Sequence, residues 1–116
     1  MEAIILAGGK GTRLQSVVSD VPKPMADVNG RPFLSYLLHF LSTKGVRKVV
    51  LSVGYKHEVI SNYYSNCFEN MSICYAIENE PLGTGGALVE SLKQVTDSNV
   101  LLLNGDSFFD INLKKP

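Results

Sequence analysis

Short apolar runs alternate along the chain with segments of helical periodicity. Four runs are mostly apolar and predict buried strands, at residues 3–6, 46–53, 71–77 and 100–103. Apolar residues recur at helical spacing in 33–41 and 87–95, and a shorter segment, 58–64, also predicts a helix. Strands that are apolar on both faces and alternate with helices are typical of a parallel sheet covered by helices. The pattern therefore predicts an α/β fold.

Glycine and proline mark where these elements begin and end. Pro32 can occupy the first turn of the helix that follows it, and Gly45 is placed to end that helix. Asn29 and Gly30 together predict a hairpin turn. The glycines within 83–86 predict a turn before the last helix.

Three glycine-rich segments follow predicted strands, at 7–23, 78–86 and 104–106. Ligands of open parallel sheets bind beyond the carboxyl ends of the strands, where these segments would lie. They hold most of the ten glycines in the chain, together with several isolated charges. We therefore expect the functional site at this edge.

The segment 8–13 (GGKGTR) follows the first predicted strand directly. Glycines let the backbone approach a ligand closely and turn its N–H groups toward an anion. The segment is not a P-loop, which ends in Gly-Lys-Ser/Thr, and Arg13 stands where a dinucleotide-binding motif has its third glycine. Taken alone, it could also be a structural connector.

Two charged residues at the same edge are candidates for chemistry. Lys23 lies between Pro22 and Pro24, which stiffen the backbone around it, although an exposed loop lysine is the alternative. Asp106 directly follows a buried strand, where a carboxylate could hold Mg²⁺ against phosphates. The alternative for Asp106 is an Asx turn or a helix cap.

Composition excludes several other classes of protein. The length of 116 residues allows one domain, and eleven basic residues balance eleven acidic ones, so we expect neither a nucleic-acid nor a membrane partner. No apolar run reaches the ~18 residues of a membrane helix, and we expect a cytoplasmic protein. Cys67 and Cys74 are expected to be reduced, partly buried thiols. His39 and His57 lack a partner at metal-ligand spacing, which favours structural roles.

Together the motifs resemble the signature of the sugar-1-phosphate nucleotidylyltransferases. They are 6–14 (LAGGKGTRL), 22–25 (PKPM), 80–87 (EPLGTGGA) and 104–106 (NGD), in the order of that family. The resemblance covers essentially the whole chain and implies a Rossmann-like three-layer sandwich with a mostly parallel sheet. Family members are considerably longer. The resemblance therefore implies that residues 1–116 are the nucleotide-binding N-terminal part of such a domain, with the sheet incomplete at its C-terminal side.

The resemblance also implies a role for each matched residue. Nucleotide contacts are implied for Leu6, Ala7, Gly8, Gly9, Gly11, Thr12, Glu80, Gly83 and Thr84. Catalysis is implied for Arg13, Lys23 and Asp106, with Lys23 bridging the sugar phosphate and the α-phosphate and Asp106 binding Mg²⁺. The implied reaction is attack by a sugar 1-phosphate oxygen on the α-phosphorus of a nucleoside triphosphate. That oxygen is ionised at pH 7, so no general base is needed.

The sequence also favours a particular base for the nucleoside triphosphate and a particular sugar for the sugar 1-phosphate. Residues 21–34 and 108–111 most resemble a guanylyl-transferring branch that acts on a heptose 1-phosphate, which favours GTP. An ionised Glu80 could accept both the N1–H and the N2 amino group of guanine. Alternatively Glu80 faces solvent, and backbone groups of Ala7 and Gly8 select the base.

Other functions stay open beside this one. The sugar could be mannose or glucose 1-phosphate, or the chain could be a non-catalytic nucleotide sensor, although such a sensor need not keep Arg13, Lys23 and Asp106. A dinucleotide-dependent oxidoreductase is disfavoured by Arg13 and by the missing acidic residue after the second strand. The sequence leaves open whether the protein is a homo-oligomer.

Overall fold

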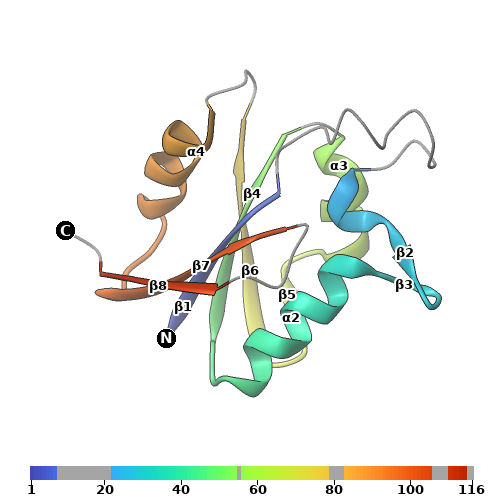
Figure 1. Cartoon of the computed structure of the whole chain (residues 1–116), viewed down its shortest axis with the longest axis horizontal. Coiled ribbons are helices and arrows are strands. Elements are labelled where there is room, and N and C mark those ends of the chain that lie inside the picture. The colour runs from blue at the N-terminus through green and yellow to red at the C-terminus, as the bar shows by residue number, and fades with distance from the viewer. Residues whose placement is uncertain (8–21, 55, 79–82, 106–109, 115–116) are drawn as a thin grey trace.

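The structure is a computed structural model, and it describes residues 1–7, 22–54, 56–78, 83–105 and 110–114 (Figure 1). For residues 23, 83, 84 and 110–114 the description covers the backbone.

A six-stranded sheet forms the centre of the molecule, in the order β5-β6-β4-β1-β7-β8. The strands in chain order are β1 Glu2–Leu6, β4 Lys48–Val53, β5 Cys67–Phe68, β6 Met71–Ile77, β7 Asn99–Asn104 and β8 Asp110–Lys114. The four central strands, β6, β4, β1 and β7, are parallel, and the edge strands β5 and β8 pair antiparallel with their neighbours. A separate two-stranded hairpin joins β2 Asp27–Val28 to β3 Arg31–Pro32.

Helices cover both faces of the sheet (Figure 1). On one face α2 Phe33–Thr43 and α3 His57–Tyr64 pack over alternate residues of β1 and β4, including Ile5 and Leu51. On the other face α4 Gly83–Leu92 covers the opposite set, including Ile4 and Val50. All four of these strand side chains are fully buried. The predicted α/β three-layer fold with a mostly parallel sheet is therefore confirmed.

The predicted turns around α2 are confirmed, with one difference at its start. Asn29 and Gly30 have positive φ angles of 53° and 85°, which the tight turn between β2 and β3 requires. Gly45 has a φ of 86° and its N–H donates to the Ser42 carbonyl at 3.1 Å, ending the helix. Pro32 precedes the helix in an extended conformation, with a ψ of 143°, and does not form its first turn.

The predicted turn at 83–86 is wrong, because α4 begins at Gly83 and its first turn contains these glycines. Three short elements were not predicted: β5, β8 and the 3-10 helix η1 Lys23–Met25. Cys67 and Cys74 are both free thiols; Cys74 is half-buried, but Cys67 is exposed, so the expected partial burial of Cys67 is wrong. Among the described residues, no helix is long and apolar enough to cross a bilayer.

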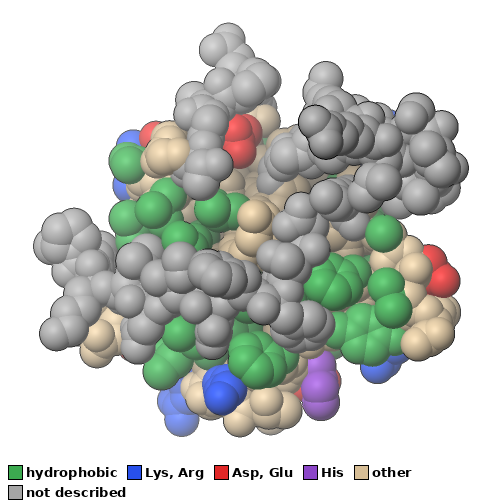
Figure 2. Space-filling model, in the orientation of Figure 1, with side chains coloured by type: hydrophobic (Ala, Val, Ile, Leu, Met, Phe, Trp, Pro, Cys, Tyr) green, Lys and Arg blue, Asp and Glu red, His purple; other side chains and the backbone are tan. Residues whose placement is uncertain are grey.

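Charged side chains of the described residues do not form a single basic surface in the view of Figure 2. Lys and Arg side chains lie scattered around the edge of that face, and hydrophobic side chains gather between them.

Candidate active site

The path of the chain through the sheet defines where a ligand can bind. From β1 the chain runs to its neighbour β4 and on to β6, and it then returns to β7 on the opposite side of β1. The connections to β4 and β6 include α2 and α3 on one face, whereas the return to β7 includes α4 on the other face. Such a reversal opens a crevice at the carboxyl ends of the two strands that flank it. Here these strands are β1 and β7, which end level because Leu6 pairs with Asn104.

Gly105 makes a close contact at this point. Its N–H donates to the Leu6 carbonyl at 2.8 Å. A Cβ atom on Gly105 would lie 3.0 Å from that carbonyl oxygen, 3.0 Å from Cγ of Pro24 and 3.3 Å from Cα of Ala7. Glycine is therefore required for the end of β7 to approach β1 this closely. The contact brings together all three segments that the sequence assigned to Leu6, Lys23 and Asp106.

The backbone of Lys23 belongs to an ordered turn. Lys23 begins the 3-10 helix η1, in which the Met25 N–H donates to the Pro22 carbonyl at 2.8 Å. Pro22 and Pro24 are buried, and Met25 joins the core under α2. The prolines thus fix the main chain on both sides of Lys23, as the sequence predicted for its backbone.

The carboxyl end of β1 is also fixed by pairing. The Ala7 N–H donates to the Ser52 carbonyl of β4 at 2.7 Å, and Ala7 is 3% exposed. Leu6 is half-buried. Backbone groups that are held on both sides in this way need no reordering when a ligand binds.

Gly83 and Thr84 form the first turn of α4, near the end of β6. Pairing between β4 and β6 continues past the strand, since the Glu78 N–H donates to the Val53 carbonyl at 2.7 Å. The first turn of α4 contains no acidic residue. The free N–H groups of a helix N-terminus favour anions, which agrees with the nucleotide contact expected for Gly83 and Thr84.

The other predicted site residues lie outside the described part of the chain, and the roles of all the predicted site residues stay predictions. Those outside the described part are Gly8, Gly9, Gly11, Thr12, Arg13, Glu80 and Asp106.

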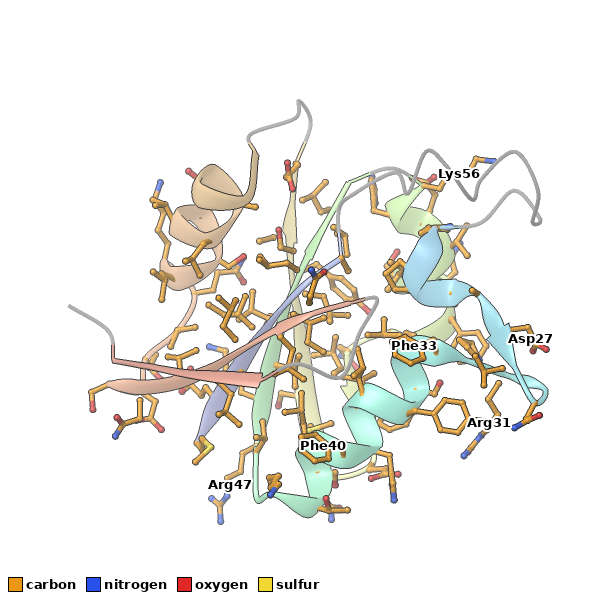
Figure 3. All side chains as sticks on the ribbon, in the orientation of Figure 1. Asp27, Arg31, Phe33, Phe40, Arg47 and Lys56 are labelled. Atoms are coloured by element: carbon orange, nitrogen blue, oxygen red, sulfur yellow. The ribbon has the colours of Figure 1, made fainter. Side chains whose placement is uncertain are left out.

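Sequence reasoning missed the carboxyl end of β4, which lies between β1 and β6 in the sheet. Lys56 lies there at the start of α3, with a positive φ of 51° (Figure 3). His57 begins α3, and its buried Nδ1 atom has no hydrogen-bond partner among the residues that the structure describes. Glu78, a half-buried residue just beyond β6, was also missed. Gly54 follows the second predicted strand, and this glycine could have indicated that the loop after β4 also belongs to the candidate site.

Neither histidine belongs to a metal site in the described residues, where no group of three or more His, Cys, Asp or Glu side chains could hold an ion. Nδ1 of His39 lies 2.9 Å from Oε2 of Glu69 on the surface. Nε2 of His57 lies 3.3 Å from Oε2 of Glu58.

Comparison with known proteins shows which family of proteins has this fold and these motifs. The family model described as nucleotidyl transferase matches residues 2–116, and the chain belongs to this family. The family resemblance predicted from the sequence is therefore confirmed.

Two curated relatives share about half of their residues with this chain over the matched part. Over 115 residues, 99% of this chain, it is 51% identical to the D-glycero-alpha-D-manno-heptose 1-phosphate guanylyltransferase of Aneurinibacillus thermoaerophilus. It is 52% identical over 115 residues to the protein of the same name from Campylobacter jejuni. The chain spans about half the length of these relatives, 50% and 52%. Among solved structures, HddC from Yersinia pseudotuberculosis complexed with GMP-PN has a TM-score of 0.79 at 44% identity, covering 90% of this chain and 47% of that one.

Proposed function

We propose that residues 1–116 form the nucleotide-binding part of an enzyme that transfers GMP from GTP to D-glycero-D-manno-heptose 1-phosphate. The observation that carries this proposal is the identity of 51–52%, over 99% of the chain, to two heptose 1-phosphate guanylyltransferases. The reversal of the chain path between β1 and β7 supports it, because the described parts of three segments with family motifs, at Leu6, Pro24 and Gly105, meet there.

The reaction joins two anions, so its main requirement is positive charge and alignment. An oxygen of the sugar 1-phosphate attacks the α-phosphorus of GTP, the new P–O bond forms, and the bond to the β-phosphate oxygen breaks with release of pyrophosphate. In this proposal Arg13 holds the triphosphate, and Lys23 bridges the sugar phosphate and the α-phosphate. Backbone groups of Leu6 and Ala7 contact the nucleoside.

Mg²⁺ is the cofactor of this proposal, and Asp106 is the residue that would hold it. The residue type fits, because carboxylate oxygens are ligands that Mg²⁺ prefers. The location also fits, since the neighbouring Gly105 lies against β1 at the carboxyl edge. When bound, the ion would offset negative charge on the phosphates.

Guanine selection is assigned to Glu80, whose carboxylate would accept from both N1–H and the N2 amino group. The alternative is selection by backbone groups of Ala7 and Gly8. We also propose that the protein acts in the cytoplasm, where nucleoside triphosphates and sugar phosphates are available.

The test is an assay for pyrophosphate release by the protein at its natural length. With GTP and Mg²⁺, release should depend on heptose 1-phosphate, and it should be slower with mannose or glucose 1-phosphate. Asp106→Asn should cut turnover severely. Asp97→Asn is the matched control, because Asp97 lies before β7 at the opposite edge of the sheet, where it makes an exposed 3.5 Å contact with the N-terminal amine and accepts from the Asn99 N–H at 3.2 Å. GTP binding without pyrophosphate release for any sugar phosphate would instead identify a nucleotide sensor.

A further inference from the structure

The contact between Gly105 and Pro24 joins the two segments that carry the proposed catalytic groups. Pro24 directly follows Lys23 in the 3-10 helix η1, and Gly105 directly precedes Asp106 at the end of β7. These segments are far apart in the sequence. In the structure the position of a Cβ on Gly105 would lie 3.0 Å from Cγ of Pro24.

This contact is closer than an ordinary side chain would allow. A Cβ at residue 105 would overlap the Leu6 carbonyl oxygen as well as the Pro24 ring, each at 3.0 Å. The Pro24 ring is buried, and its Cγ atom lies where it leaves little room for a side chain on Gly105. Any larger residue at 105 therefore forces β1, η1 or the end of β7 to shift.

Of these three, β1 is the least able to move. Its five residues pair with β4 on one side and with β7 on the other, and the Ala7 N–H extends the pairing to Ser52. The turn that carries Pro24 is a three-residue 3-10 helix, held by the hydrogen bond from Met25 to Pro22. The overlap would thus be relieved in η1 or at the end of β7, and each of these carries one proposed catalytic residue.

We propose that Gly105 and Pro24 are positioning residues, whose contact fixes the end of β7, which directly precedes Asp106, against the turn η1 that begins at Lys23, before substrate binds. The inference rests on the proposed function, because it assumes that Lys23 and Asp106 act in one reaction. Reaction rates are sensitive to the placement of such groups, since a misplacement of about 1 Å can cost about a hundredfold. A shift of a few tenths of an ångström should then cost about tenfold.

The kinetic test compares Gly105→Ala, Pro24→Ala and the double variant in the protein at its natural length. Gly105→Ala should lower kcat about tenfold and leave KM for GTP within about twofold, because β1 holds the nucleoside contacts in place. In the Pro24→Ala background, Gly105→Ala should lower kcat clearly less, because Cγ of Pro24, one of the two atoms at 3.0 Å from the new Cβ, has been removed. The proposal would be overturned if the kcat loss of the double variant equalled the product of the two single losses, or if the single variants changed only KM.

Gly45→Ala separates positioning from stability. Gly45 has a φ of 86° with nothing within 4 Å of its Cβ position, so alanine there strains the backbone without a steric overlap. It ends α2 at the opposite edge of the sheet. This variant should lower Tm but keep kcat. An equal loss of kcat in Gly45→Ala would assign the Gly105 effect to stability and overturn the positioning role.

Hydrogen exchange of the Met25 amide tests the contact without any reaction. Met25 is 9% exposed, and its N–H donates to Pro22 within η1. In Gly105→Ala this amide should exchange faster while the amides of β1 keep their rates. If the wild-type protein transfers no nucleotide, the proposed function fails, but the exchange measurement still tests whether the Gly105–Pro24 contact holds η1 in place. An unchanged exchange rate at Met25 in Gly105→Ala would refute this role of the contact.

Discussion

The hydrogen bond between Ser35 and Tyr64 allows a quantitative test of the core under α2 and α3. The two hydroxyl oxygens lie 2.7 Å apart and join the start of α2 to the end of α3. Ser35 is 5% exposed and Tyr64 is 4% exposed. The Tyr64 ring also packs edge-on against Phe68, with centroids 5.7 Å apart. Tyr64→Phe removes one hydroxyl and keeps the ring in place.

The expected cost follows from what the remaining hydroxyl loses. Tyr64→Phe leaves the buried Ser35 hydroxyl without this partner, which costs about 1–3 kcal/mol in the free energy of unfolding. Ser35→Ala should cost less than Tyr64→Phe, because alanine improves the helix propensity of α2 by up to about 0.7 kcal/mol. The double variant removes both polar groups, so it should be nearer to wild type than the two single costs added together.

The pH dependence gives an independent measurement. Burial raises the pKa of Tyr64 to about 12 in the folded state. A tyrosine in the unfolded chain has a pKa near 10, so the folded state favours the protonated hydroxyl. The resulting stability is fully present below about pH 10 and is lost as the pH rises through about 12. The advantage of wild type over Tyr64→Phe should therefore shrink across this range.

Urea unfolding followed by circular dichroism measures both effects. The single and double variants are compared at pH 8, and wild type and Tyr64→Phe are then compared from about pH 9 to about pH 12. A double variant as unstable as the sum of the two singles would refute the burial argument. A wild-type advantage that stays constant to about pH 12 would refute the assignment of the raised pKa to burial in the folded state.

Three further predictions concern single side chains. Lys23→Ala should keep Tm and lose transferase activity; an unfolded variant whose folded fraction stays active would make Lys23 structural. Glu80→Gln should admit UTP or dTTP, because an amide matches the donor and acceptor of a pyrimidine; if Glu78→Gln does so instead, Glu78 reads the base. The hydrogen bond with His39 lowers the pKa of Glu69 below 4.5. The stability advantage of wild type over Glu69→Gln, measured by urea unfolding, should therefore be present above about pH 4.5 and fade below it, and an advantage that grows on acidification would contradict this.

The longer elements could be predicted because each buries a periodic set of side chains. The strand β6 occupies the predicted range 71–77, and α2 contains the predicted apolar stripe. The strand β5 and the turn η1 could not be predicted, because elements of two or three residues are too short to show a periodic pattern of apolar side chains. At α4, glycines that favour a turn by propensity form a helix, because tertiary packing outweighs propensity.

The candidate site could be predicted only as a set of segments. Glycine, lysine and aspartate at strand ends pointed to one edge of the sheet, and at that edge the structure brings together Leu6, Pro24 and Gly105 from three of these segments. Their mutual contact could not be predicted, because it depends on how Pro24 packs against β7, and sequence spacing carries no record of that packing. The end of β4 was missed for a related reason: Lys56 and His57 form no motif, and only the strand order brings them beside β1.

The pairing at the end of β1 limits how backbone groups can select a base. The Leu6 carbonyl already accepts from Gly105, and the Ala7 N–H already donates to Ser52. Ala7 therefore has only its carbonyl to offer a base, and Leu6 has only a second lone pair on its oxygen. A carbonyl can accept from the N1–H of guanine, but it can equally accept from the N3–H of uracil, so these groups alone do not distinguish the two. Guanine differs in presenting a second donor, its N2 amino group, beside the first. Selection of GTP by hydrogen bonding therefore requires another acceptor, which is the role proposed for Glu80, with the backbone carbonyl of Gly8 as the alternative.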